Sequence, residues 1–291
     1  MKWFIPAKTF LLGEYAAVAE ASAIVLTTAP CFELSLTSEQ SLKGIHPESP
    51  AGLWWHQQKT NKGLSWHDPY KGRGGLGASS AQFLASYLAS CSLRNISPNI
   101  DHMLNAYYQV SWTGKGLRPS GYDVIAQSQH GCVYINKSNK IIQSYHWPFH
   151  DLSFFLIHTG VKLATHHHLQ DTALPKQIDY LSKLVEDAKQ AFEQINSLQL
   201  LDCIHQYHEK LAELNLVAEH SLKLIQQFKE YPEVLAIKGC GALGADILLL
   251  VTSQTHAPTL NDKLKASNHT ILATENSFAF EKNYSFSLDW A

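Results

Sequence analysis

The sequence has little net charge and no long apolar run. Its 23 Lys and Arg residues nearly balance its 25 Asp and Glu residues, leaving a formal charge of −2 at pH 7. This balance does not favour a nucleic-acid or anionic-membrane partner. No stretch approaches 18 uninterrupted apolar residues, so we expect no membrane-spanning helix. Lys8 and Glu14 interrupt the apolar N-terminus early, and we therefore expect no signal peptide.

The cysteines are few, odd in number and scattered. The five lie at Cys31, Cys91, Cys132, Cys203 and Cys240. No CxxC pair occurs among them, so the sequence indicates neither a disulfide framework nor a cysteine zinc site. Reduced thiols in the cytoplasm are the simplest interpretation. No internal repeat or low-complexity tract is visible either.

The remaining sequence is that of an ordinary globular protein, with 45% apolar and 16% charged residues in 291 positions. This length predicts one or two domains. We expect an α+β fold, because strands and helices are mixed without a regular βαβ repeat. The predicted strands are 2–5, 22–36, 131–136, 140–145 and 152–158, with two more in 234–252 and others near 269–281. The predicted helices are 79–92, 99–113, two or three within 169–229, and 257–266, whereas 38–74 is expected to be loop or short irregular strands.

The most informative segment is the run Gly74, Gly75, Leu76, Gly77, Ala78, Ser79 and Ser80, which leads directly into an apolar helix. A glycine-rich loop at a helix N-terminus binds anions, because unpaired amides and the positive end of the helix dipole converge there. A nucleotide phosphate is the expected anion. By itself, however, the segment could equally be a tight turn with an N-capping serine. It is not a Walker A loop, because no GxxxxGK[ST] occurs in the chain.

Two further segments favour the phosphate interpretation, namely 6–15 (PAKTFLLGEY) and 238–246 (KGCGALGAD). Together the three segments resemble the signature motifs of the GHMP kinase family, which includes galactokinase, homoserine kinase, mevalonate kinase and phosphomevalonate kinase. The resemblance implies ATP and Mg²⁺ as cofactors. It also implies two domains: 1–155, like ribosomal protein S5 domain 2, and 156–291, ferredoxin-like.

The resemblance also implies the roles of individual residues. Lys8 and Asp123, in the segment 119–124 (PSGYDV), are expected to be the catalytic pair. A lysine among apolar neighbours is costly to bury unless it is paired, and a paired Lys8 would keep Asp123 ionised. Gly74 to Ser80 are expected to bind the ATP phosphates, with Ser79 also contacting Mg²⁺. The alternatives are an exposed lysine, an Asx-turn at Asp123 and a plain helix cap at Ser79.

The expected substrate contacts come from four segments. They are Glu14, Tyr15, Ser120, Gly121, Lys162, Thr165, Gly241 and Ala242. Lys162 and Thr165 belong to a stretch that ends in three adjacent histidines, His166–His168. Adjacent residues rarely point at one ion, so we expect that tract to be a solvated loop or a helix start.

The acceptor is predicted from charge. Gly13-Glu14-Tyr15 and Asp246 are most similar to phosphomevalonate kinases, with mevalonate kinases next. No carboxylate occurs between Ala106 and Arg118, where mevalonate kinases have a magnesium-binding glutamate, and this stretch instead holds the basic residues Lys115 and Arg118. A phosphorylated acceptor is already anionic and needs cations more than a base. We therefore expect phosphomevalonate as the acceptor, with mevalonate as the alternative. We expect the protein to be either a monomer or a homodimer.

The third segment departs from the family pattern. Leu243 and Ala245 stand where family members have glycine. If those positions require positive φ, a side chain strains the turn. A third hypothesis is therefore a degenerate member that binds a ligand without transferring phosphate.

Overall fold

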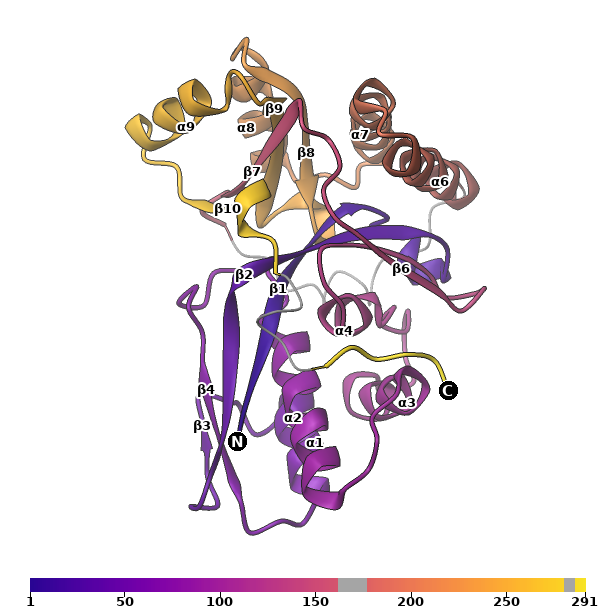
Figure 1. Cartoon of the computed structure of the whole chain (residues 1–291), viewed down its shortest axis with the longest axis vertical. Coiled ribbons are helices and arrows are strands. Elements are labelled where there is room, and N and C mark those ends of the chain that lie inside the picture. Colours follow the sequence, from indigo (N-terminus) through magenta and orange to yellow (C-terminus); the bar gives the residue numbers. More distant parts are fainter. Residues whose placement is uncertain (162–176, 280–285) are drawn as a thin grey trace.

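The computed structural model describes residues 1–161, 177–279 and 286–291. Within these ranges the chain forms two antiparallel-rich sheets, each covered by helices (Figure 1). The fold is α+β, as predicted. The buried apolar side chains of both sheets and their helices form one continuous core.

The first sheet is organised around one long hairpin. Strand β1 (Lys2–Leu12) pairs with β2 (Ala23–Thr37) along nearly its whole length. The other edge of β2 pairs with two strands in turn, β4 (Gly63–His67) near its end and β5 (Cys132–Asn136) near its start. Strands β3 (Leu42–Lys43) and β6 (Ile141–Tyr145) complete the sheet on either side. The sequence predicted β5 and β6 to within one residue, but it recognised only the beginning of β1.

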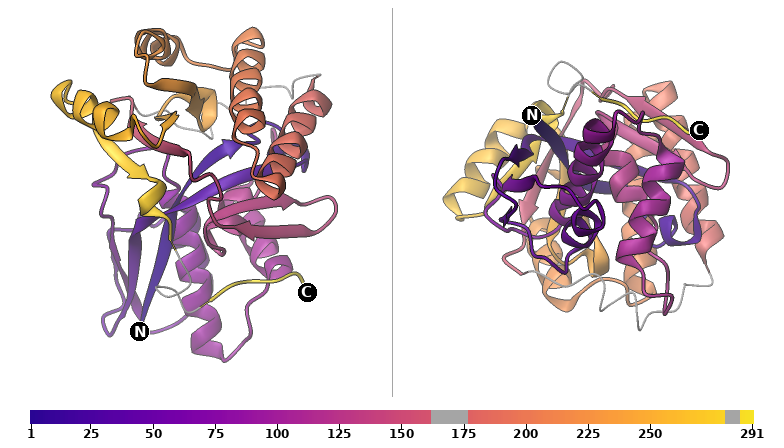
Figure 2. Two further views of the ribbon diagram at one scale, coloured as in Figure 1. Left: turned by 45° about the horizontal axis from the view of Figure 1, so that its top comes forward. Right: turned by 90° about the horizontal axis from the view of Figure 1, so that it is seen from below.

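Helices α1 (Pro50–Gln57), α2 (Ala78–Arg94), α3 (Ile100–Ser111) and α4 (Tyr122–Gln127) pack together beside this sheet (Figure 2). Helix α2 is buried along most of its length, which explains its nearly continuous small and apolar sequence. The expectation of loop or short strands over 38–74 was wrong for α1. There, the Ser49 side chain accepts the Gly52 N–H and Pro50 occupies the first turn, so local capping starts a helix in a weakly patterned segment.

The second sheet has the strand order β10-β7-β9-β8 and is antiparallel throughout. Its strands are β7 (Leu152–His158), β8 (Val234–Cys240), β9 (Ile247–Ser253) and β10 (Ile271–Thr274). Its helices are α6 (Ile178–Gln194), α7 (Ser197–Glu213), α8 (Glu219–Lys229) and α9 (Ala257–Ala266). Short 3₁₀ turns lie at Ala17–Ala19, Ala242–Gly244 and Glu275–Ser277. This β-α-β-β-α-β order with an antiparallel sheet is ferredoxin-like, as expected.

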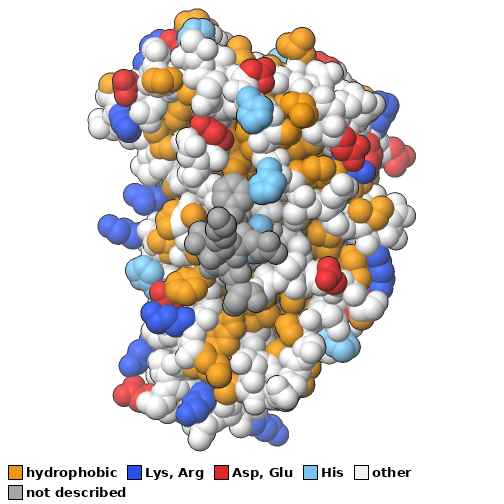
Figure 3. All heavy atoms as spheres, in the orientation of Figure 1, with side chains coloured by type: hydrophobic (Ala, Val, Ile, Leu, Met, Phe, Trp, Pro, Cys, Tyr) orange, Lys and Arg blue, Asp and Glu red, His pale blue; other side chains and the backbone are white. Residues whose placement is uncertain are grey.

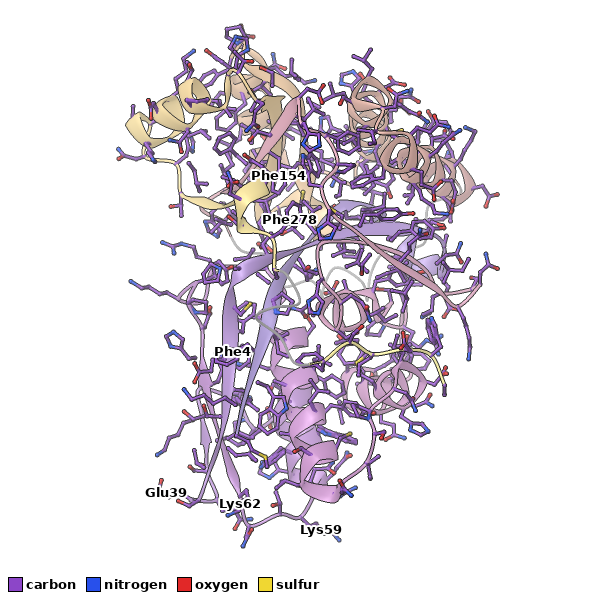
Figure 4. All side chains as sticks on the ribbon, viewed as in Figure 1. Phe4, Glu39, Lys59, Lys62, Phe154 and Phe278 are labelled. Carbon is purple, nitrogen blue, oxygen red and sulfur yellow. The ribbon has the colours of Figure 1, made fainter. Side chains whose placement is uncertain are left out.

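The two sheets are joined by an aromatic cluster and by the returning C-terminus. Figure 4 shows Phe154 of β7 and Phe278 beside one another, and their ring centroids are 5.5 Å apart. Trp147 packs edge-on against Phe154 at 5.2 Å. The last residues then return to the helices beside the first sheet, where Gln129, just after α4, donates to the Leu288 carbonyl and the Ile100 N–H of α3 donates to the Asp289 carbonyl. The expected domain boundary between 155 and 156 lies inside β7, which belongs wholly to the second sheet.

Figure 3 shows one face of the molecule, coloured by the type of side chain. Side chains of both charges are spread over this face. In the ranges that the structure describes, no helix is long and apolar enough to cross a membrane.

Candidate active site

The structure brings Lys8 and Asp123 together. Lys8 Nζ lies 2.8 Å from Asp123 Oδ1, and the side chains are 8% and 35% exposed. Lys8 comes from the middle of β1, and Asp123 from the first turn of α4. The ammonium also lies 4.9 Å from the centroid of the Phe10 ring. A nearly buried lysine is thus paired with a carboxylate that solvent and a ligand can still reach.

The glycine loop runs directly beside this pair. The backbone N–H of Lys8 donates to the Leu76 carbonyl at 3.0 Å, which fixes the loop to β1. Gly75 and Gly77 have φ of +83° and +76°, conformations that favour glycine. Helix α2 follows at once, and no side chain of the described residues caps its N-terminus, where Gly77 is the N-cap residue. Its first-turn amides and the exposed Ser79 therefore remain available to an anion.

The side chains of two residues of the predicted loop, Leu76 and Ser80, contact the protein interior and are not available to a ligand. The Leu76 side chain is 1% exposed and belongs to the core, so only its backbone can serve a ligand. The Ser80 hydroxyl lies 2.9 Å from the Gly77 carbonyl and 2.7 Å from Gln127 Oε1. Gly74 is also buried, whereas Ala78 is partly exposed.

Gln127 is a site residue that the sequence analysis missed. Its side-chain amide donates to the carbonyls of Pro6, at 2.8 Å, and of Gly77, at 3.1 Å. It therefore ties β1 to the start of α2. The one available signal was its spacing from Asp123, because residues four apart on a helix share a face.

The turn before Asp123 also requires glycine. Gly121 has φ of +79°, and a Cβ there would lie 2.5 Å from Leu104 Cδ2. The neighbouring Ser120 carbonyl accepts hydrogen bonds from the Tyr108 hydroxyl, at 3.0 Å, and from Lys137 Nζ, at 2.8 Å. These contacts fix the first turn of α4 and hence the position of Asp123.

The basic residue predicted nearest to this turn is already paired. Arg118 Nη2 lies 2.6 Å from Glu20 Oε1, and Lys137 Nζ lies 2.9 Å from the same oxygen. Partial burial acts to raise the pKa of Glu20, but the hydrogen bonds from Lys137 and Arg118 hold it below its usual value. Arg118 is therefore less available to an acceptor than its sequence position suggested, whereas Lys115 is exposed.

Other cations flank the glycine loop on its N-terminal side. Lys71 and Arg73 are exposed, and neither forms an ion pair within the described part of the chain. The Arg73 charge reaches His158 at the end of β7. Burial lowers the pKa of His158, the Arg73 guanidinium lowers it further, and Asp246 opposes both. Arg73, His158 and Asp246 thus gather where the loop meets the second sheet.

The third glycine segment forms the turn between β8 and β9. Gly241 has φ of +86° and Leu243 has φ of +53°, so a leucine does occupy a left-handed position. Such a residue costs on the order of 1–2 kcal/mol. Ala245 has φ of −86° and carries no such strain. The replacement of the expected glycine by Leu243 therefore strains the backbone, whereas the replacement by Ala245 does not.

This turn contacts the glycine loop and the end of β1. A Cβ on Gly75 would lie 2.8 Å from Ile247 Cδ1 and 2.9 Å from Asp246 Cβ, so only glycine permits this approach. Just after β1, Glu14 Oε1 lies 2.6 Å from Lys238 Nζ. The Tyr15 hydroxyl accepts the Leu243 N–H at 3.2 Å. Three segments distant in sequence therefore meet at one place.

The predicted acceptor contacts differ in their exposure. Glu14 and Tyr15 are buried against the third turn, and Gly241 and Ala242 of that turn are partly exposed. Their contact with an acceptor stays a prediction. Lys162, Thr165 and the His166–His168 tract lie outside the described residues.

The described residues fit a nucleotide with magnesium. The uncapped N-terminus of α2 and two positive-φ glycines suit a phosphate chain. Among the described residues no group of three or more His, Cys, Asp or Glu side chains could hold a metal on its own. Mg²⁺ needs no such cage, because it is usually held by one or two protein oxygens together with substrate phosphates. Ser79 and Asp123 carry side-chain oxygens of the kind such an ion binds, and their contact with Mg²⁺ stays a prediction.

Comparisons with known proteins agree with this fold. No family model and no curated protein matches the chain. Among solved structures, the Methanococcus jannaschii mevalonate kinase is 16% identical, with 94% of this chain and 97% of that chain covered and a TM-score of 0.71. The Streptococcus pneumoniae phosphomevalonate kinase in complex with phosphomevalonate and AMPPNP is 14% identical, with 94% and 99% covered and a TM-score of 0.75. The Lactococcus lactis galactokinase complexed with galactose is 10% identical, with 96% and 94% covered and a TM-score of 0.69. The chain therefore has the GHMP kinase fold, as predicted.

Proposed function

We propose that this protein is an ATP-dependent small-molecule kinase that transfers the γ-phosphoryl group of ATP to phosphomevalonate. The observation that carries the proposal is the 2.8 Å contact between Lys8 and Asp123 beside the glycine loop. Phosphoryl transfer depends on positioning and on charge neutralisation, and this arrangement offers both.

Each part of the site has a distinct task in this proposal. The amides of the glycine loop and of the first turn of α2 bind the phosphate chain, with the Ser79 hydroxyl beside them. Lys8 directs the acceptor oxygen toward the γ-phosphate and holds the Asp123 carboxylate in place through their 2.8 Å contact. When bound, Mg²⁺ neutralises charge on the phosphates, and Ser79 and Asp123 would hold it.

A phosphorylated acceptor is favoured by the unpaired cations near the loop. Lys71 and Arg73 are exposed and free of ion pairs within the described residues, so they can offset the charge of two approaching phosphates. The pairing of Arg118 with Glu20 makes one cation near the site less available, but Lys71 and Arg73 remain.

Mevalonate is the second candidate, because Asp123 is about one-third exposed and bears a carboxylate that can accept a hydroxyl proton. An assay of ADP release with mevalonate and phosphomevalonate in parallel separates the candidates. Turnover with phosphomevalonate alone supports the proposal, and turnover with mevalonate alone replaces the acceptor. ATP binding without turnover on either would support the ligand-binding alternative, for which the strained Leu243 is the structural reason.

A further inference from the structure

Glu14 takes part in a buried ion pair that links the two sheets. Glu14 follows the end of β1, and Lys238 lies within β8, where the first sheet meets the second (Figure 1). Their side chains are 4% and 0% exposed. Glu14 Oε1 accepts from Lys238 Nζ at 2.6 Å and from the Gly241 backbone N–H at 3.3 Å. One carboxylate oxygen therefore holds both the lysine and the third glycine turn.

Stability alone does not explain this pair. Desolvating two charges offsets much of their attraction, so an apolar pair of similar volume is often equally stable or more so. The second oxygen, Glu14 Oε2, is buried, and it has no hydrogen-bond partner among the described residues. A pair that served only the core would be expected to satisfy both oxygens.

The neighbours of Glu14 point to the same turn. Tyr15 accepts the Leu243 N–H through its hydroxyl, so consecutive residues hold two amides of one turn. The Tyr207 hydroxyl donates to the Glu14 carbonyl at 2.8 Å, which fixes the backbone from α7. The third glycine turn also lies close to Gly75. Asp246 and Ile247, which follow the turn, leave no room for a Cβ on Gly75.

We propose that Glu14 is a positioning residue that holds the third glycine turn against the phosphate-binding loop. Lys238 fixes the carboxylate, the carboxylate fixes the Gly241 amide, and the turn that follows supports Gly75. The inference rests on the proposed function, since it concerns the nucleotide site. It gives Glu14 a role other than the substrate contact that its sequence motif implied.

Two double variants test this role without a buried charge in either. Glu14→Gln with Lys238→Met retains an acceptor oxygen for the Gly241 amide, whereas Glu14→Met with Lys238→Met removes it. Thermal melting is measured first, to establish that both double variants fold. Amide hydrogen exchange at Gly241 in the ligand-free protein and the dissociation constant for ATP are then compared. We expect the Met/Met variant to exchange about five-fold faster at Gly241 and to bind ATP about five-fold more weakly than the Gln/Met variant.

Equal exchange at Gly241 in the two variants would overturn the inference, and so would faster exchange with unchanged ATP affinity. Failure of the wild-type protein to bind ATP would refute the proposed function, and the exchange comparison would still decide whether Glu14 holds the turn. If a double variant does not fold, Tyr15→Phe serves instead. It removes one acceptor and keeps the ring, so Leu243 should exchange faster and ATP should bind more weakly. Unchanged values in Tyr15→Phe would count against the inference.

Discussion

The stem of Lys8 crosses the backbone of Gly77 so closely that a Cβ on residue 77 would lie 2.8 Å from Lys8 Cγ and 3.0 Å from Lys8 Cε. Gly77 also lies at the end of the glycine loop, directly before α2, and has φ of +76°. One glycine therefore sets both the start of α2 and the path of the lysine toward Asp123.

Gly77→Ala is expected to lower both stability and turnover. The new methyl group must displace Lys8 from its 2.8 Å contact with Asp123, and the left-handed backbone adds strain on the order of 1–3 kcal/mol. Turnover and urea unfolding check this. Gly72→Ala is the matched control, because Gly72 has φ of +79° with nothing within 4 Å of its added Cβ. It should lose stability but keep its turnover. Equal turnover losses in the two variants would show that crowding of Lys8 is irrelevant.

Asp123→Asn should reduce turnover by about 100-fold or more while leaving ATP affinity nearly unchanged. The amide keeps the shape of the carboxylate but leaves Lys8 without its ionised partner. Steady-state kinetics and direct ATP titration measure the two effects. Asp101→Asn is the control, because Asp101 also lies in the first turn of a helix and pairs with a lysine, Lys140. Wild-type turnover in Asp123→Asn would remove Asp123 from the proposed reaction.

The sequence predicted helices and strands well where the apolar periodicity agrees with the residues that begin and end an element. Helix 257–266, with Pro258 in its first turn, and strand 152–158 were predicted with their observed ends. Helix α1 was missed because its signal is a cap, Ser49, within a segment lacking a clear apolar period. Local patterns describe local structure, and such caps are easily overlooked.

Pairing between distant residues was predicted only where a motif implied it. Lys8 and Asp123 were expected to be close because known motifs place them so, whereas the pairs Glu14–Lys238 and Arg118–Glu20 have no local signature. Such contacts depend on how the sheets pack. Sequence spacing alone could not indicate them.

Arg73→Gln is expected to raise KM for phosphomevalonate several-fold and to leave KM for mevalonate nearly unchanged. Arg73 is exposed beside the loop and forms no ion pair within the described residues, so its charge is available to an acceptor phosphate. The same change should raise the pKa of His158 toward its ordinary value, because Arg73 helps to lower it. Kinetics with both acceptors and an NMR titration of His158 check the two effects.

Arg94→Gln is the control for Arg73, because Arg94 is exposed at the far end of α2. It should alter neither KM nor the His158 titration. An equal rise of KM for both acceptors in Arg73→Gln would mean that Arg73 does not select the acceptor. A shifted His158 titration with unchanged KM values would place Arg73 near the second sheet but outside the acceptor site.

Acidification is expected to destabilise the protein through His208 of α7. Burial lowers the pKa of His208 to about 4, with further lowering by Lys229, Lys238 and His205. The unfolded chain binds a proton near pH 6.5, so it holds more protons than the folded chain between pH 6.5 and 4. The contribution of neutral His208 is therefore complete above pH 6.5 and is lost as the pH falls toward 4, by up to about 3 kcal/mol.

Urea unfolding at pH 7 and pH 5 measures this loss. His208→Leu should flatten the pH dependence, because an apolar side chain in the same buried position takes up no proton. His205→Leu is the matched control on the same helix, since His205 is half-exposed and lies 3.0 Å from Glu209. It should retain most of the wild-type slope, because His205 is the smallest of the named causes that lower the pKa of His208. If His208→Leu and His205→Leu lose stability between pH 7 and pH 5 as steeply as the wild type, another group is responsible, and the buried neutral state of His208 is not what limits acid stability.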